Sequence, residues 1–290
     1  MQKSFWMLVS SFLFALMAAF TKMGAAHFGT FELVFYRSLM GIALLSIWIR
    51  ATHRSVRTPV FWGHMLRSFL GTFSLTIWFF AIAYLPLGTS MTLNYTNPLY
   101  MTLIAAALAL RKGERIDMRA AAAVAAGFAG VTLVLKPELH SGQEIPALVG
   151  LSSGFFSALA YFQIRELTRM HEPDWRIVFY FTLFGTVWGG AGQLLLAHGF
   201  TPRSAENVPA LLGMGLCATG AQLAMTRAWG GENILLTAVF QYSAIVFAAL
   251  FGVLFFGEAV GPASAAGIAV ILVSGVWAAW SSRRAGKKAG

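Results

Sequence analysis

Two basic residues with apolar neighbours are the first candidates for binding chemistry in this sequence. Arg37 lies six residues into the apolar stretch 31–49, which is roughly 9 Å along a helix at about 1.5 Å per residue. A charged side chain deep in a bilayer costs on the order of 2.5–3.5 kcal/mol, so it should meet a ligand or a partner. Arg37 is therefore predicted to bind a carboxylate or phosphate, with a structural ion pair or a snorkelling side chain as the alternatives. Lys22 would add positive charge to a nearby cavity or reach the headgroups, and Arg67 is interpreted as an anchor near a span end.

A polar run interrupts another apolar stretch at residues 94–98, which read Asn-Tyr-Thr-Asn-Pro. Pro98 removes one backbone hydrogen bond and frees a carbonyl that the flanking amides can satisfy, so we expect a break in the helix that lines a cavity or serves as a packing kink. Gln241 and Tyr242 lie at a similar depth later in the chain. The predicted polar and aromatic cavity residues are Asn94, Tyr95, Asn97, Gln241 and Tyr242, with Trp78, Tyr161 and Gln222 as weaker candidates.

Glu114 and Glu258 each follow a glycine at the end of an apolar stretch. A titrating carboxylate in such a place can couple a process to protons. The preferred prediction is structural, because a carboxylate stabilises the positively polarised N-terminus of the helix that follows it.

An enzyme is weighed because residues 150–154 match the G-x-S-x-G pattern of a nucleophile elbow. That motif needs a preceding strand, whereas here it opens an apolar stretch of helical length. Five of the six histidines fall in connectors, His64 falls at a span end, and no H-E-x-x-H or P-loop is present. The single cysteine, Cys217, cannot form a disulfide framework or a zinc cluster. No catalysis, metal or cofactor is expected.

The elements that carry these residues are predicted to be membrane-spanning helices. Hydrophobic residues make up 58% of the chain and charged residues 11%, against roughly 25% charged in soluble domains. Apolar stretches recur near the 20-residue length that crosses a bilayer. The predicted spans are 5–23, 31–49, 63–84, 88–110, 119–136, 147–164, 177–197, 207–227, 233–256 and 261–281.

The basic residues predict the orientation of these ten spans. With the N-terminus inside, 16 of the 21 basic residues fall on the cytoplasmic face and only Lys136 and Arg203 fall outside. Both termini are therefore predicted to be cytoplasmic, and the protein is expected in the inner membrane. The net charge of +10 is interpreted as a topology signal and not as a nucleic-acid surface.

An internal repeat divides the predicted spans into two sets of five. Gly113-Glu114 and Gly257-Glu258 end spans four and nine, 144 residues apart, and each precedes a span rich in alanine and glycine. Five spans separate the copies, so they must have opposite topology. The predicted organisation is one five-helix repeat at residues 1–140, a second at 146–282, and a basic cytoplasmic tail at 283–290.

These residues resemble the EamA family of the drug/metabolite transporter superfamily over essentially the whole chain. The resemblance depends on the order and spacing of five features, and Tyr242 stands where the second half often has the proline that matches Pro98. The features are Phe35-Tyr36-Arg37, Ala81 to Pro86, Pro98, Glu114, and Glu258 with the glycine-rich last span.

The resemblance implies an all-α polytopic protein with ten helices as a five-plus-five inverted repeat around a central substrate cavity. The predicted function is secondary transport of a small anionic or zwitterionic metabolite by alternating access, with export preferred. Uptake of a zwitterion such as S-adenosylmethionine and export of an opine-like metallophore remain open, as do a channel, a membrane scaffold or an intramembrane enzyme. The expected partners are the substrate and the lipid bilayer, with the protein a monomer or homodimer.

Overall fold

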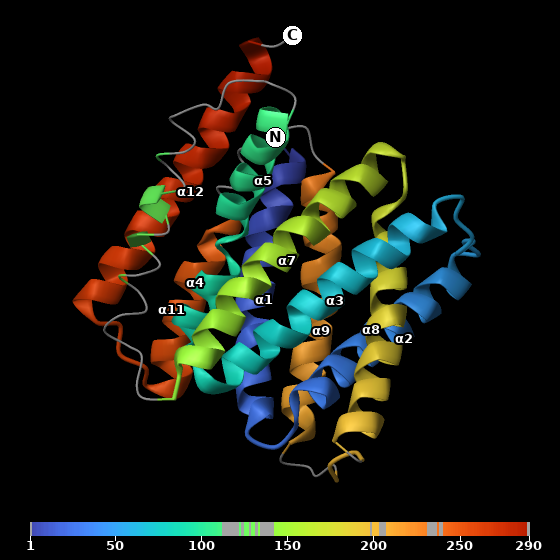
Figure 1. Ribbon diagram of the computed structural model, residues 1–290. Coiled ribbons are helices and arrows are strands. Elements are labelled where there is room, and N and C mark those ends of the chain that lie inside the picture. Colours follow the sequence, from blue (N-terminus) through green and yellow to red (C-terminus); the bar gives the residue numbers. More distant parts are fainter. Residues whose placement is uncertain are drawn as a thin grey trace.

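The computed structural model describes most of the chain as helix (Figure 1). The residues that it describes are 2–111, 122, 125–127, 129–130, 133, 142–197, 199–202, 207–230, 237 and 240–288. The helices in these ranges are α1 (Gln2–Ala25), α2 (Thr30–Ala51), α3 (Phe61–Tyr84), α4 (Leu87–Asn94), α5 (Asn97–Arg111), α7 (Glu144–Arg169), α8 (Asp174–Leu196), α9 (Val208–Trp229), α11 (Ser243–Phe256) and α12 (Pro262–Lys288).

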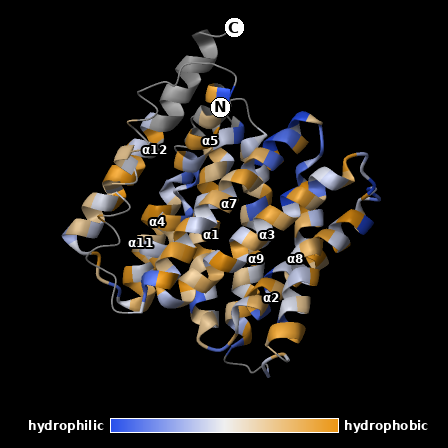
Figure 2. Cartoon of the chain, viewed as in Figure 1, coloured by the Kyte–Doolittle hydropathy of each residue, from blue (hydrophilic) through white to orange (hydrophobic). Residues whose placement is uncertain are grey.

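Six of the described helices are long and apolar enough to cross a bilayer, namely α1, α2, α3, α7, α8 and α9. Shorter apolar segments lie at Ser243–Phe256 and Pro262–Ser274. Large apolar side chains are exposed on their outer faces, as at Leu195 and Val187 of α8, where acyl chains would replace water. Figure 2 shows hydrophilic residues gathered at the α2–α3 and α7–α8 connectors and hydrophobic residues along the helices. This distribution is that of a multi-pass membrane protein.

The helix packing is reciprocal between the two halves of the chain. Helix α1 packs mainly on α9, helix α3 packs on α7, and helix α2 packs on α8. The first helix of each half thus contacts the third helix of the other, and the second helices contact each other. The start of α1 and the end of α12 lie at the same end of the bundle (Figure 1). We call this the basic end, since Arg54, Arg169 and Arg227 lie there, and we call the other the opposite end.

Glycines on α8 permit its close approach to α2. A Cβ at Gly189 would lie 2.6 Å from the backbone nitrogen of Phe35, and one at Gly185 would overlap the hydroxyl of Ser38. Contacts this short force a larger residue to push the helices apart. The small-residue spacing therefore marks a helix–helix contact, as in many membrane bundles.

The polar run at residues 94–98 breaks one predicted span into two helices. Helix α4 ends at Asn94 and α5 begins at Asn97. Pro98 has no N–H to donate to the carbonyl of Asn94, and Nδ2 of Asn97 donates to that oxygen at 3.2 Å instead. Thr96 similarly bonds the carbonyl of Leu93 at 2.7 Å. The predicted break is confirmed, and side chains of the run itself satisfy the freed carbonyls.

The other boundaries agree with the predicted spans to within a few residues, except in two places. Of the predicted span 233–256, residues 233–236, 238 and 239 lie outside the described residues. Helix α11 begins at Ser243, directly after Gln241 and Tyr242, at the level of the α4–α5 break in the other half. Helix α12 continues to Lys288, into the predicted tail. The predicted span 119–136 lies mostly outside the described residues, and Glu114 lies outside them altogether.

Candidate functional site

A small cavity of about 40 Å³ lies between the two halves of the bundle. The first half supplies one wall from α1, α3 and α4, and the second half supplies the other from α7, α8 and α9. The polar and aromatic side chains in its lining include Arg67, Ser74, Trp78, Asn94, Tyr95, Ser157, Tyr161, Phe181 and Gln222. Ligand pockets usually measure about 300–1,000 Å³, so this conformation is closed around its centre.

Arg67 places a buried guanidinium in the wall of this cavity. Its side chain is only 2% exposed, and its Nη2 donates to Oε1 of Gln222 across the two halves at 3.3 Å. Its Nε and Nη1 have no hydrogen-bond partner in the described part of the protein, and it makes no ion pair there. Burying a cation without a partner costs free energy, so these N–H groups are available to donate hydrogen bonds to an anion.

The interpretation of Arg67 as an interfacial anchor is therefore wrong. Gly71 permits its inward position. Any Cβ at residue 71 would overlap Nη1 of Arg67, so the guanidinium occupies the space that this glycine leaves on the next turn of α3. The side chain thus folds along α3 toward the cavity, against the ring of Phe181 at 4.2 Å.

Arg37, the predicted anion anchor, is not among the residues that line the cavity. It is 1% exposed, and its guanidinium carbon lies 5.1 Å from the centre of the Phe181 ring, which also contacts Arg67. Its Nε and Nη2 lack partners among the described residues. Glu32 does not pair with it, since that carboxylate accepts bonds from the backbone and hydroxyl of Thr201 at 2.9 and 2.8 Å. Arg37 therefore adds positive charge next to the Phe181 ring, which itself lines the cavity.

A polar cluster joins α3, α4 and α7 on the other side of the cavity. Asn94 donates to the hydroxyl of Ser153 at 2.8 Å and to that of Ser157 at 3.3 Å. Ser74 lies 2.8 Å from the same Ser157 hydroxyl and donates to the carbonyl of Ser153. The serine of the G-x-S-x-G match is the neighbouring Ser152, which donates to the carbonyl of Val149 at 2.8 Å within helix α7 and does not lie on the strand-to-helix turn of a nucleophile elbow. The hydrogen bonds of Ser74, Ser153 and Ser157 instead hold helices α3, α4 and α7 together.

Three of the predicted aromatic residues, Trp78, Tyr95 and Tyr161, line this cavity, and their contact with a substrate stays a prediction. Trp78 is buried and its indole N–H has no partner among the described groups, so it adds a second free donor. Tyr95 lies at the α4–α5 break, and Tyr161 stacks at an angle on Trp229, with ring centres 5.7 Å apart. The described lining residues include no carboxylate, so the cavity offers donors and positive charge.

Asn97, Gln241 and Tyr242, also predicted to face a cargo, do not line the cavity. Nε2 of Gln241 donates to Oδ1 of Asn97 at 3.2 Å, so the two amides bind each other. Tyr242 is buried, ends the turn before α11, and has no partner for its hydroxyl in the described residues. Asn97 and Gln241 lie at the same depth, as predicted, and they contact each other between the two halves.

Lys22 and Glu258 form an ion pair at the opposite end of the bundle. Lys22 also donates to the carbonyl of Leu85 at 2.9 Å, and Glu258 accepts from the backbone N–H of Leu87 at 2.8 Å. Lys22 is not among the residues that line the cavity, and its binding of a substrate stays a prediction. Glu258 does cap a helix, but the helix is α4 of the other half and not the following span.

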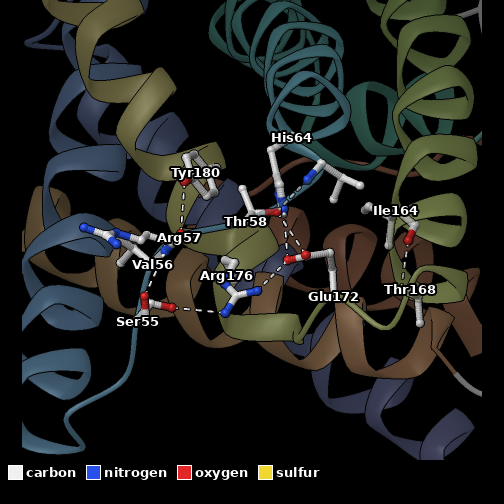
Figure 3. A network of polar contacts seen from close by, with 11 residues as sticks. Ser55, Val56, Arg57, Thr58, His64, Ile164, Thr168, Glu172, Arg176 and Tyr180 are labelled. Atoms are coloured by element: carbon white, nitrogen blue, oxygen red, sulfur yellow. Dashed lines mark hydrogen bonds and ion pairs between the residues drawn. The ribbon is translucent and has the colours of Figure 1, made fainter.

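A second network closes the basic end (Figure 3). Glu172, between α7 and α8, accepts from Thr58 at 2.9 Å, from Arg176 at 3.0 Å and contacts Nε2 of His64 at 3.1 Å. Arg176 also donates to the carbonyl of Ser55 at 3.1 Å. The α2–α3 connector of the first half is thereby tied to the second half.

The same contacts determine the ionisation of this carboxylate. Burial by itself raises the pKa of Glu172, but the hydrogen bonds that it accepts outweigh this effect and lower the pKa below its ordinary value of 4.5. Glu172 is therefore ionised at neutral pH.

A helical pattern would have identified the cavity face of α3. Arg67, Gly71, Ser74 and Trp78 follow one another at intervals of four, three and four residues, which places them on one face. Phe181 carries no comparable signal, because a phenylalanine in an apolar helix usually faces lipid or the protein core.

The fold and this cavity define a polytopic helical membrane protein built of two related halves around a polar centre. The sequence also matches the model of the EamA-like transporter family at residues 2–136 and 145–279, one match for each half. The chain belongs to this family, and the two matches fit the five-plus-five inverted arrangement.

Curated relatives of this chain are transporters. It is 30% identical over 266 residues to the pseudopaline exporter CntI of Pseudomonas aeruginosa, with 92% of each chain covered. It is 26% identical to a riboflavin transporter of Vibrio cholerae, covering 89% of this chain and 86% of the relative. It is 22% identical to an S-adenosylmethionine uptake transporter of Rickettsia prowazekii, covering 96% and 92%. A solved crystal structure shares the fold at a TM-score of 0.64 and 21% identity, covering 95% of this chain and 98% of the other. The protein is a small-molecule transporter.

Proposed function

We propose that this transporter carries a small anionic or zwitterionic metabolite by alternating access, with Arg67 holding the negative group. The observation that carries the proposal is the buried guanidinium whose Nε and Nη1 are unpartnered in a cavity between the two halves. A planar guanidinium suits carboxylate and phosphate, which accept two parallel hydrogen bonds.

The surroundings of Arg67 favour anionic over purely cationic cargo. Arg37 adds a second positive charge behind Phe181, and Trp78 adds a free indole N–H. A cationic group would find no carboxylate in the described lining. Trp78 and Tyr161 would pack the apolar part of the cargo.

The two closed ends support rocking of one half against the other. Lys22 with Glu258 ties the halves at the opposite end, and Glu172 with Thr58 and His64 ties them at the basic end. A metabolite does not fit into about 40 Å³, so one of these networks would open to admit it. A cavity closed at both ends is what the proposed cycle requires of its occluded step.

Orientation and direction complete the proposal. The protein would lie in the inner membrane with the basic end and both termini in the cytoplasm, an orientation that the excess of basic residues supports. Export is the proposed direction, supported by the family resemblance and by a relative named as an exporter.

The test compares metabolites inside and outside cells that lack the protein, produce it, or produce Arg67→Gln. Arg169→Gln is the matched control, since Arg169 is exposed at the basic end and pairs only loosely with Glu166. We expect an anionic or zwitterionic compound in the medium with the intact protein and the control, and at least a tenfold lower rate with Arg67→Gln. Equal export by Arg67→Gln would contradict the anion anchor, and accumulation inside the cells would contradict the direction.

A further inference from the structure

A second, larger recess lies at the basic end. It measures about 940 Å³ and shares no described lining residue with the central cavity. Helices α1 and α9 form one side, and the end of α2 with the start of α8 forms the other. We call it the basic-end groove.

The inner part of this groove is apolar and opens toward the lipid side of the bundle. Leu13, Leu45 and Leu223 line its wall. Val9, also in the lining, is 46% exposed, so the groove is open on the face of α1 that carries it. From Trp6 to Leu13 the groove follows α1 for roughly 10 Å at about 1.5 Å per residue. An occupant must therefore have an apolar part that reaches into the membrane.

The rim of the groove is cationic and aromatic. The guanidinium of Arg54 lies 5.3 Å from the Trp48 ring, and that of Arg227 lies 4.9 Å from the Trp6 ring. Stacking holds each guanidinium over an indole and leaves its N–H groups at the edge free to bind. Neither arginine forms an ion pair with a described residue.

The rim charges are complementary to a lipid phosphate. Asp174 is the one acidic group in the described lining, against the two arginines, so the rim is positive on balance. Tryptophans at helix ends lie at headgroup level, and basic residues there attract anionic lipids. A soluble anion would satisfy the arginines but would leave the apolar wall open to lipid.

We propose that the basic-end groove binds an anionic phospholipid, with its phosphate between Arg54 and Arg227 and an acyl chain along Leu13 and Leu223. The bound lipid joins α1 and α2 of the first half to α9 of the second. This assignment is independent of the cargo proposed for the central cavity, because the two sites use different residues.

Native mass spectrometry of the purified full-length protein tests this assignment. The protein is titrated with phosphatidylglycerol, with phosphatidylethanolamine of the same acyl chains, and with inorganic phosphate. We expect phosphatidylglycerol to bind at least fivefold more tightly than phosphatidylethanolamine, and phosphate to compete poorly. The double variant Arg54→Gln/Arg227→Gln should lose at least fivefold in phosphatidylglycerol binding.

Two further variants separate the site from general surface charge. Arg165→Gln/Arg169→Gln removes the same charge from the end of α7, which does not line the groove, and should leave binding unchanged. Leu44→Trp fills the groove without changing charge and should also weaken phosphatidylglycerol binding. The proposal is overturned if Arg54→Gln/Arg227→Gln binds phosphatidylglycerol like the unmodified protein, if both lipids bind equally, or if phosphate displaces the lipid. Size-exclusion profiles show that each variant is folded.

Discussion

Gln241 donates a hydrogen bond to Asn97 at 3.2 Å, and these two residues are 144 positions apart in the chain. The same interval separates Glu114 from Glu258, so Asn97 and Gln241 occupy equivalent positions in the two repeats. Two equivalent residues can touch only where the pseudo-twofold axis passes between them. This contact therefore marks the axis, next to the break between α4 and α5 and the start of α11.

The amide pair should be coupled in stability. Gln241→Leu leaves the buried Asn97 amide without this partner, and we expect a loss of about 1–3 kcal/mol in unfolding free energy. Asn97→Leu should cost more, since Asn97 also bonds the carbonyl of Asn94. A double-mutant cycle in detergent measures the coupling, and additive losses would show that the hydrogen bond contributes nothing.

Gly71→Ala should weaken cargo binding without weakening the fold. The new Cβ overlaps Nη1 of Arg67, the mobile end of a side chain, so the guanidinium moves while the helix gains up to about 1 kcal/mol in propensity. We expect a severalfold higher half-saturation concentration in a transport assay. Gly63→Ala is the control on the same helix, because its Cβ meets Leu167 at 3.1 Å and not the cavity. If both substitutions raised the half-saturation concentration equally, the result would contradict a role of Arg67 in cargo binding.

The Glu172 network should stabilise the fold in a pH-dependent manner. The folded pKa of Glu172 is below its ordinary value of 4.5, so its ionised form stabilises the protein above about that pH. This contribution is lost as the pH falls through the lower folded value. Glu172→Gln should therefore unfold at lower temperature than the unmodified protein at pH 7, with the difference shrinking toward pH 3.

The matched control for this titration is Glu166→Gln, at an exposed ion pair with Arg169 on the same end. Exposed pairs contribute about 0–1 kcal/mol, so its unfolding temperature should stay close to that of the unmodified protein. If the difference in unfolding temperature between Glu172→Gln and the unmodified protein stayed constant from pH 7 to pH 3, the lowered pKa of Glu172 would be contradicted.

The Lys22–Glu258 pair should affect stability, and Glu258 should contribute more than Lys22. Lys22→Gln removes the ion pair, whereas Glu258→Ala removes both that pair and the cap on Leu87. Loss of a cap costs about 1 kcal/mol, so Glu258→Ala should be the less stable variant in thermal unfolding. Equal unfolding temperatures of the two variants would show that the hydrogen bond from Leu87 to Glu258 adds nothing to stability.

The sequence by itself determined the features that depend on local chemistry. Runs of apolar residues set the helices, because each span must satisfy its own backbone in lipid. Pro98 and its neighbours set the break between α4 and α5, because proline lacks an N–H and the adjacent amide lies within reach of the freed carbonyl. The sequence also indicated that Gln241 and Tyr242 lie at a depth similar to that of the polar run at residues 94–98.

Only the tertiary structure decided which of these polar groups meet. The sequence indicates how deep a residue lies along its helix. The direction in which its side chain points and the residue that it contacts depend on packing between distant segments. Arg37 and Arg67 both lie within apolar helices, yet the space left by Gly71 and the contact with Gln222 on α9 place Arg67 in the cavity wall. Lys22 likewise meets Glu258 across 236 residues, an interaction that no local pattern contains.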